Sequence, residues 1–196
     1  MTVGIAGLGL IGGSLAKAYK RDDSVTVLGF DANESVCGIA RAAGAIDGVL
    51  TQDRVLDCDL ILVALYSDVS IAYMQSIAPR IRKDALLIDC CGTKRAVCQT
   101  GFALAKQHGF TYAGGHPMAG THKSGFAASR ADLFDGAVMV IVPPVFDDIS
   151  LLARIKSALA PAGFARISVT TAVNHDRVIA YTSPLPHVLS NAYVKS

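Results

Sequence analysis

A glycine-rich turn near the N-terminus constrains the fold of this chain more than any other feature. Gly7, Gly9 and Gly12 follow the apolar run Thr2–Ala6 and precede Gly13–Arg21, which has helical periodicity. The first glycine permits a tight turn, the second lets a ligand approach the backbone, and the third lets a helix pack closely on a strand. The motif predicts a helix N-terminus open to an anion such as a pyrophosphate. The alternative is a glycine-rich turn without function, since glycine is common in this chain, at 18 residues.

Short apolar runs alternate with helical segments along the rest of the chain. Most runs are continuously apolar, which is typical of parallel strands covered on both faces. The alternation predicts an α/β fold with a doubly wound parallel sheet. Expected strands are Thr2–Ala6, Thr26–Asp31, Leu60–Ala64, Leu86–Asp89, Phe110–Ala113, Val138–Val142 and Ala165–Val169, and expected helices are Gly13–Arg21, Glu34–Ala43, Asp68–Pro79, Arg95–His108 and Asp147–Leu159.

Two segments depart from this alternation. Residues 114–135 are rich in Gly, Ser, His and Lys and have no clear periodicity, and a loop of that length is usually functional. Residues 170–196 are expected to form an apolar helix that is interrupted by Pro184 and Pro186. We therefore expect residues 1–169 to be one domain. Residues 170–196 would leave it and pack on another chain or on a further C-terminal region.

Composition excludes several other classes of protein. Lys and Arg number 18 against 16 Asp and Glu, and this balance argues against a nucleic-acid-binding protein. Hydrophobic residues make up 52% of the chain, yet no apolar run reaches the roughly 18 residues of a membrane span. The N-terminus lacks the basic region of a signal peptide. The five cysteines contain no CxxC pair. We expect reduced thiols in a cytoplasmic protein, with Cys90 and Cys91 packing in the core and no metal site.

An acidic residue ends the second expected strand. Asp31 follows the glycines at the distance at which a carboxylate accepts hydrogen bonds from the ribose hydroxyls of an adenosine. The same carboxylate would repel a 2′-phosphate, and Ala32 and Asn33 provide no arginine to neutralise one. Together with the glycines, Asp31 predicts a dinucleotide site that favours NAD over NADP.

His116 is the strongest candidate for a catalytic group. It lies in Gly114–Thr121, just after an expected strand, at the edge of the sheet where α/β proteins bind ligands. Pro117 restricts His116 to an extended conformation. A histidine held there can act as a general base, with activity falling below a pKa of about 6 to 7. The alternative is a histidine that satisfies backbone carbonyls in a structural turn.

Four stretches in this order resemble the prephenate dehydrogenase family, the prephenate and arogenate dehydrogenases of tyrosine biosynthesis. They are Gly7–Ala16, Asp89–Lys94, Gly115–Gly125 and His175–His187. The first stretch is shared by many dinucleotide enzymes, whereas the third and fourth are specific to this family. The resemblance implies a Rossmann-like domain followed by the start of an all-helical dimerisation domain, and hence a homodimer.

The resemblance also implies a reaction. NAD takes a hydride from the hydroxyl-bearing ring carbon of prephenate, His116 accepts the hydroxyl proton, and loss of CO₂ gives 4-hydroxyphenylpyruvate. His187 matches a histidine that contacts substrate, and His175 matches one that shapes the substrate pocket. Further expected substrate contacts are Thr93, Thr121 and Ser124. Expected cofactor contacts are Gly7, Leu8, Gly9, Leu10, Ile11, Gly12, Asp31, Leu65 and Gly92.

The chain departs from the family pattern in the second, third and fourth stretches. In the third, His122 stands where an acidic residue is common in the family. Gly92 stands where the family often has a serine that bonds the reacting hydroxyl, so Thr93 or Cys91 supplies that contact or it is absent. Pro184 stands where the family has a histidine. A family arginine that binds a substrate carboxylate has no counterpart up to Ser196. The local cations Lys94, Lys123, Arg130 and Arg177 are expected to be solvated surface charges rather than substrate ligands.

Other functions remain open from the sequence alone. The chain could prefer arogenate, or be another Rossmann dehydrogenase of the β-hydroxyacid or imine reductase type. Those enzymes share the glycine loop but typically draw a catalytic lysine from the helical domain. A third reading is a non-catalytic module that binds NAD and dimerises through its terminal helix. We expect a small-molecule substrate, and neither nucleic acid nor membrane as a partner.

Overall fold

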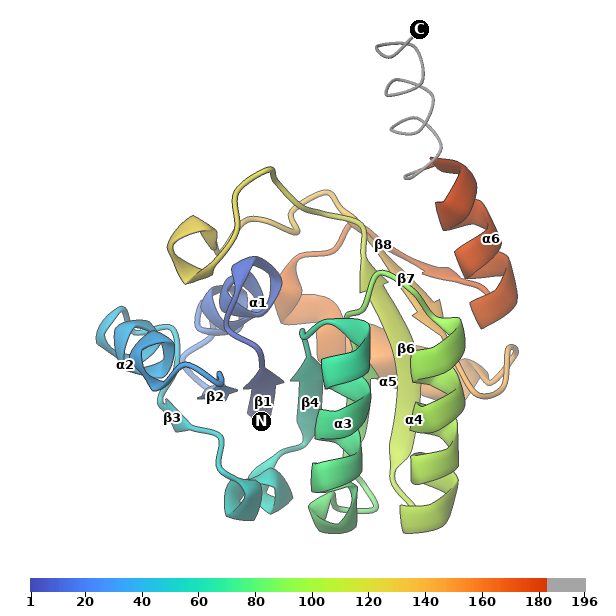
Figure 1. Cartoon of the computed structure of the whole chain (residues 1–196), viewed down its shortest axis with the longest axis horizontal. Coiled ribbons are helices and arrows are strands. Elements are labelled where there is room, and N and C mark those ends of the chain that lie inside the picture. Colours follow the sequence, from blue (N-terminus) through green and yellow to red (C-terminus); the bar gives the residue numbers. More distant parts are fainter. Residues whose placement is uncertain (183–196) are drawn as a thin grey trace, which may run out of the picture.

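The computed structural model describes residues 1–182, which form a twisted sheet with helices on both faces (Figure 1). The strand order is β3-β2-β1-β4-β5-β6-β7-β8. The strands are β1 (Thr2–Ala6), β2 (Thr26–Phe30), β3 (Gly48–Val49), β4 (Leu60–Val63), β5 (Leu86–Asp89), β6 (Thr111–Pro117), β7 (Val138–Val142) and β8 (Arg166–Val169). The order reverses between β1 and β4, which creates a crevice at their carboxyl ends where such folds bind ligands.

The predicted parallel arrangement is confirmed for β1 to β6, but it is wrong for the end of the sheet. β6 pairs antiparallel with β7, and β8 then runs parallel to β7. The chain leaves β6 at the carboxyl edge and returns through residues 118–137, which contain a short 3-10 turn and no crossover helix. A strand reached in this way must run in the opposite direction. A continuously apolar run such as Val138–Val142 does not reveal that direction.

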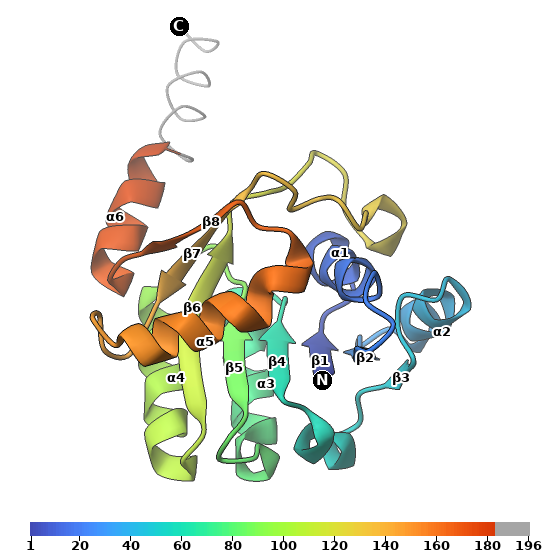
Figure 2. The same cartoon turned by 180° about the vertical axis from the view of Figure 1, so that it is seen from behind.

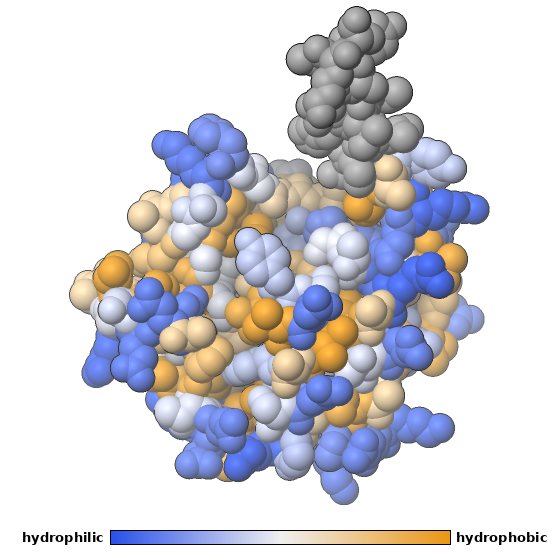
Figure 3. Space-filling model, in the orientation of Figure 1, coloured by the Kyte–Doolittle hydropathy of each residue, from blue (hydrophilic) through white to orange (hydrophobic). Residues whose placement is uncertain are grey.

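The helices cover the two faces of the sheet unequally. They are α1 (Leu10–Tyr19), α2 (Glu34–Ala42), α3 (Ser67–Ile77), α4 (Arg95–His108), α5 (Ile149–Leu159) and α6 (Ala172–Thr182). Leu15, Ala40 and Ile155 from α1, α2 and α5 belong to one buried cluster, and Met74 and Val97 from α3 and α4 to the other. Figure 2 shows α5 crossing the face opposite α3 and α4. The outer surface of α3 and α4 mixes polar and apolar side chains (Figure 3).

Most element boundaries agree with those predicted, and the exceptions are α1, β6 and β3. α1 begins at Leu10, so Gly12 and Gly13 lie inside the helix. β6 continues to Pro117, so His116 lies on a strand and not in the loop predicted from its glycines. The two-residue strand β3 was not predicted, because a run that short has no periodicity.

The end of the chain is described only as far as α6. A helix is present over Ala172–Thr182, as predicted for the first part of residues 170–196. Pro184, Pro186 and His187 lie outside the described residues. None of the helices within residues 1–182 combines the length and the apolarity needed to cross a bilayer.

Candidate active site

The three glycines of the first turn have different surroundings. Gly7 has a φ of +88° and donates its N–H to the carbonyl of Phe30, 2.7 Å away. A Cβ atom on Gly12 would lie 1.7 Å from the carbonyl oxygen of Gly7, so the helix can approach the turn only without a side chain. A Cβ atom on Gly9 would have nothing within 4 Å. Gly9 is therefore free of any requirement from the fold, and the space beside it is available to a ligand.

Asp31 ties the end of β2 to this turn. Its Oδ2 atom accepts a hydrogen bond from the N–H of Leu8 at 2.9 Å, and its Oδ1 atom accepts one from Asn33 at 3.0 Å. These contacts hold the carboxylate at the carboxyl edge of the sheet, beside the N-terminus of α1. No side chain within the described residues caps that helix, and its first turn contains no acidic residue. The N-terminus of α1 can therefore receive an anion.

A cleft of about 460 Å³ runs along the carboxyl edge from Asp31 toward Gly92. Of the predicted cofactor residues, its lining includes Gly7, Gly9, Leu10, Ile11, Asp31, Leu65 and Gly92. Leu8 and Gly12 are buried beneath it. A second hollow of about 700 Å³ adjoins it at Asp31 and extends between α2 and α3. The two together offer an elongated site whose glycine turn and acidic residue fit the phosphates and one ribose of a dinucleotide.

His116 lies on β6, opposite Val140 of β7. Its Nδ1 atom is 2.9 Å from Nε2 of His175, which lies on α6. A Cβ atom on Gly92 would be 4.0 Å from the Nε2 atom of His116, so this nitrogen is the one on the side of the cleft. Burial, helped by His175 and Lys94, lowers the pKa of His116 to about 4.

His175 is almost fully buried, with 3% of its surface exposed. Its Nδ1 atom is 2.8 Å from Oδ1 of Asp176. The carboxylate of Asp176 also accepts hydrogen bonds from the backbone N–H groups of Lys94, at 2.7 Å, and Arg95, at 3.0 Å. Burial raises the pKa of Asp176, but the bonds from His175, Arg95 and Lys94 outweigh it and lower the pKa below its usual value. Asp176 thereby joins α6 to the N-terminus of α4.

Lys94 is not the solvated surface charge that was predicted. Its side chain is fully buried, and its ammonium group donates hydrogen bonds to Asp89 and to the carbonyl of Gly115. Asp89 also accepts a hydrogen bond from the hydroxyl of Tyr112 at 2.6 Å. The prediction failed because a lysine that starts a helix is usually exposed, and only the fold places Asp89 beneath it.

The two residues predicted to replace the family serine direct their hydrogen bonds toward α3 and not toward His116. The hydroxyl of Thr93 is 3.0 Å from the hydroxyl of Ser67 at the start of α3. The thiol of Cys91 donates to Ser70 at 3.2 Å, and burial raises its pKa to about 11. Both side chains therefore point toward α3. Cys90 and Cys91 are buried, in agreement with their predicted packing role.

The loop after β6 carries two further predicted substrate contacts, Thr121 and Ser124, whose surroundings differ. Ser124 lines the cleft together with Lys123. Thr121 is exposed and forms a turn with the backbone of Lys123. Arg130 is exposed and paired with Asp132 at 3.1 Å, as expected for a surface charge.

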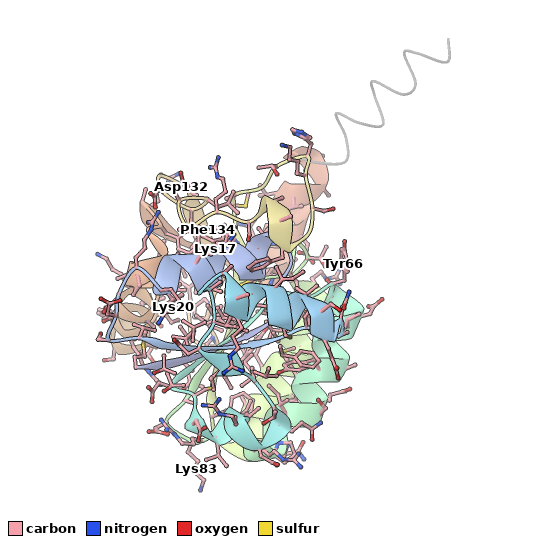
Figure 4. The ribbon with its side chains drawn as sticks, turned by 90° about the vertical axis from the view of Figure 1, so that its left-hand side faces the viewer. Lys17, Lys20, Tyr66, Lys83, Asp132 and Phe134 are labelled. Carbon is pink, nitrogen blue, oxygen red and sulfur yellow. The ribbon has the colours of Figure 1, made fainter. Side chains whose placement is uncertain are left out.

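Sequence reasoning missed the buried Asp89–Lys94 pair, Asp176 and Tyr66. Tyr66 lines the cleft, has 90% of its surface exposed, and projects outward from the domain (Figure 4). The position of Asp176 directly after His175 was a signal that could have been followed, since a carboxylate often orients a histidine. Within the described part of the chain, no three His, Cys, Asp or Glu side chains are grouped so that they could hold a metal ion.

Comparison with known proteins identifies relatives along nearly the whole chain. The chain is 34% identical over 191 residues to the cyclohexadienyl dehydrogenase of Zymomonas mobilis, covering 96% of this chain and 64% of that protein. It is 33% identical over 193 residues to the prephenate dehydrogenase of Lactococcus lactis, covering 97% of this chain and 52% of that protein. The chain thus spans between about half and two thirds of the length of these relatives.

Solved structures of similar proteins share the fold. The arogenate dehydrogenase of Synechocystis superposes with a TM-score of 0.88 at 28% identity, over 100% of this chain and 68% of that one. The prephenate dehydrogenase of Aquifex aeolicus, in complex with hydroxyphenyl propionate and NAD⁺, superposes with a TM-score of 0.86 at 27% identity, over the same shares. An imine reductase of Myxococcus stipitatus, at 20% identity and a TM-score of 0.70, shares the fold alone.

The family match covers most of the sheet and ends at the last strand. Residues 15–169 match the family described as prephenate dehydrogenase, nucleotide-binding domain. This match contains Asp31, the Asp89–Lys94 pair and His116, which the fold brings to one edge of the sheet. The chain belongs to the prephenate dehydrogenase family, in its nucleotide-binding domain.

Proposed function

We propose that this chain is the cofactor-binding part of an NAD-dependent dehydrogenase that converts prephenate to 4-hydroxyphenylpyruvate. The observation that carries the proposal is the position of His116, whose Nε2 atom would be 4.0 Å from a Cβ atom on Gly92. Gly92 lines the same cleft as the glycine turn and Asp31. A base and a dinucleotide site at one edge are what coupled removal of a proton and a hydride requires. The names of the relatives support the same reaction.

Different residues along the cleft would contact different parts of the dinucleotide. Gly9 and the N-terminus of α1 would receive the pyrophosphate, and Asp31 would accept hydrogen bonds from the ribose of the adenosine. Leu65 and Gly92 line the other end of the cleft and would flank the nicotinamide side. NAD⁺, when bound, supplies a hydride acceptor. The carboxylate of Asp31 disfavours the extra phosphate of NADP.

His116 would act as the general base. In its neutral form, Nε2 takes the proton of the substrate hydroxyl as the carbon that bears it is oxidised, and CO₂ then leaves as the ring becomes aromatic. The lowered pKa of His116 keeps this ring neutral throughout the physiological range. Thr93, Thr121, Ser124 and His187 remain proposed substrate contacts, and His175 remains a residue proposed to shape the substrate pocket. Among them, Ser124 has the best support because it lines the cleft.

Arogenate is the second candidate substrate. It differs from prephenate in carrying an amine where prephenate has a keto group on its side chain. A solved arogenate dehydrogenase and a cyclohexadienyl dehydrogenase are among the relatives. Either substrate carries carboxylates that need cationic partners. Among residues 1–182, Lys123 is the cation that lines the cleft.

We also propose the organisation of the whole protein. Residues 1–169 would form the dinucleotide-binding domain, and residues 170–196 would begin a helical domain through which two copies form a homodimer. The family match that ends at Val169 supports this boundary. All five cysteines are buried and unpaired, which supports a reducing compartment such as the cytoplasm. Sedimentation of the full-length protein as a monomer would contradict the dimer.

The decisive experiment measures NADH formation by the full-length protein with prephenate and arogenate in parallel. We expect turnover with NAD⁺ and much less with NADP⁺. Replacing His116 with Asn should preserve NAD⁺ affinity and lower kcat by roughly 10²- to 10⁴-fold, because general-base catalysis contributes about that much. NAD⁺ binding without turnover of either substrate would instead favour the non-catalytic module. A His116→Asn variant with normal kcat would remove His116 from the mechanism.

A further inference from the structure

Three side chains form a continuous hydrogen-bonded chain that ends at the cleft. His116 Nδ1 is 2.9 Å from His175 Nε2, and His175 Nδ1 is 2.8 Å from Asp176 Oδ1. The first residue lies on β6 and the other two lie on α6. The proposed reaction assigns a role to His116 and leaves Asp176 without one.

The direction of these hydrogen bonds follows from Asp176, because its carboxylate can only accept hydrogen bonds. An ionised carboxylate has no proton to donate, so His175 must donate from Nδ1. A neutral imidazole carries one proton, so Nε2 of His175 is then an acceptor. His116 must therefore donate from Nδ1, which leaves the lone pair of His116 on Nε2. That nitrogen is the one near Gly92, on the side of the cleft.

We propose that Asp176 is a positioning residue that selects the tautomer of His116, so that Nε2 is free to accept the substrate proton. This inference rests on the proposed function and deepens it, because it explains why Nε2 is the basic atom of His116. With the tautomers reversed, Nε2 of His116 would carry a proton and could not act as a base. The tautomer of His116 is thus set by Asp176, which acts through His175 and lies on α6, the helix that follows the sheet.

The surroundings of Asp176 keep its carboxylate ionised and fixed. The N–H groups of Lys94 and Arg95 donate to its two oxygens at the N-terminus of α4, where the helix dipole also favours a negative charge. An amide in this place cannot satisfy all partners. With its oxygen toward His175 and Lys94, its NH₂ group would face the N–H of Arg95. Turned the other way, the NH₂ group would face Lys94 and could donate to His175, which favours the opposite tautomer.

The charges around His116 come from three elements. Asp89 at the end of β5 and Asp176 on α6 favour a proton on His116, whereas Lys94 at the start of α4 and His175 on α6 oppose it. Once Nε2 has accepted a proton, the imidazolium keeps its bond from Nδ1 to His175. The carboxylate of Asp176 then stabilises the added charge through His175, as an aspartate does behind a catalytic histidine.

The test begins with the tautomer itself, which needs no substrate or cofactor. Nitrogen-15 NMR of the histidine rings distinguishes a protonated from an unprotonated ring nitrogen, and the chain contains only five histidines. His116→Asn and His175→Asn variants would assign the two signals. We expect His116 to carry its proton on Nδ1 near neutral pH. In Asp176→Asn, the signal should move toward a mixture or toward the opposite tautomer. Wild-type protein with the proton of His116 on Nε2 would overturn the proposal without any variant.

Activity of the full-length protein gives the second measurement. We expect Asp176→Asn to lower kcat by at least about tenfold and by no more than the roughly 10²- to 10⁴-fold contributed by a general base, with unchanged affinity for NAD⁺. Arg177→Ala is the matched control, since Arg177 is the next residue on α6 and its side chain bonds only Asn174 among the contacts described. That control should leave both the His116 signal and kcat unchanged.

The outcomes separate this proposal from the function on which it rests. If Asp176→Asn keeps the wild-type tautomer and kcat, Asp176 does not position the base, while a kcat lost in His116→Asn would still support the proposed function. If wild-type protein has the expected tautomer but turns over neither substrate, the proposed function fails and the structural relationship stands. If Asp176→Asn loses kcat with an unchanged His116 signal, the residue acts only through the packing of α6, and the proposal is overturned.

Discussion

The ammonium group of Lys94 is paired with the carboxylate of Asp89, and both side chains have 0% of their surface exposed. The pair joins the start of α4 to the end of β5. Lys94 also donates to the carbonyl of Gly115, the residue before His116, so the same ammonium group holds the strand that carries the proposed base. A buried ion pair of this kind is sensitive to the loss of one partner, because the other charge is left without compensation.

We therefore expect Lys94→Met to destabilise the domain by about 3 to 5 kcal/mol, the usual cost of breaking a buried pair from one side. Urea unfolding of the chain measures the change. Lys83→Met is the matched control, because Lys83 is exposed at the opposite end of the domain (Figure 4) and should change the free energy of unfolding by less than about 0.5 kcal/mol. Equal stability of the two variants would show that the pair contributes nothing.

Gly9 and Gly12 should respond differently to the same substitution. Gly12→Ala places a methyl group against the carbonyl of Gly7, so we expect a loss of stability of about 1 to 3 kcal/mol or more. The methyl group of Gly9→Ala meets no atom of residues 1–182 within 4 Å, so this substitution should leave stability nearly unchanged. It should nevertheless weaken NAD⁺ binding, because the methyl group occupies the space proposed for the pyrophosphate. Unfolding curves and calorimetric titration separate the two effects. Undiminished NAD⁺ affinity in Gly9→Ala would place the phosphates elsewhere.

The preference for NAD over NADP should depend on the charge of Asp31. Asp31→Asn keeps an oxygen that can accept from Leu8 but removes the negative charge, whereas Asp31→Ala removes both. We expect Asp31→Asn to relieve the repulsion of NADP⁺ and so to narrow the difference in affinity between the two cofactors. We expect Asp31→Ala to do the same and also to weaken NAD⁺ binding. Titration with each cofactor measures this, with the exposed Asp23→Asn as control. Equal affinity for both cofactors in the wild-type protein would contradict the role of Asp31.

The pH dependence should reflect the lowered pKa of His116. Neutral His116 is the proposed base, so kcat/KM should be lost as pH falls through about 4, below the range of about 6 to 7 expected for an ordinary histidine. The ring signals of His116 in an NMR titration give its pKa directly. A midpoint at 6 or above would show that burial does not control this group.

The same shift affects stability, because the unfolded chain binds the proton more readily than the folded one. Between about pH 6.5 and 4, the unfolded state carries the proton on His116 and the folded state does not, so acid weakens folding in this range. His116→Asn removes this contribution. The free energy of unfolding should therefore fall less in the variant than in the wild type between pH 7 and pH 4.5. If the free energy of unfolding falls equally with pH in the two proteins, the lowered pKa of His116 would be contradicted.

The space beside the base provides a further prediction. Within the described part of the chain, a Cβ atom on Gly92 would meet only the Nε2 atom of His116, at 4.0 Å. Gly92→Ser should therefore fold, and its hydroxyl would be within reach of Nε2. We expect a higher kcat in this variant than in Gly92→Ala, because the hydroxyl can bond both the base and the reacting hydroxyl. Identical kcat values for the two variants would show that a hydroxyl at this position does not contribute to catalysis.

Local sequence determined much of this protein. The glycine turn, the acidic residue after β2 and the apolar runs predicted most strands and helices and one wall of the cleft. They could do so because backbone conformation and burial on two faces depend on neighbouring residues. His116 was also identified from its own stretch of chain. Each of these features is encoded within about 10 to 30 residues, which is the reach of periodicity and of a βαβ unit.

Only the tertiary structure decided how distant segments meet. β7 runs antiparallel because the chain returns from β6 without a crossover helix, and an apolar run has no intrinsic direction. Lys94 is buried because β5 places Asp89 beneath it, although a lysine taken alone belongs at the surface. Asp176 reaches His116 through His175 only after α6 docks on the N-terminus of α4. The contact that we propose to select the basic nitrogen of His116 is therefore one that no local sequence pattern contains.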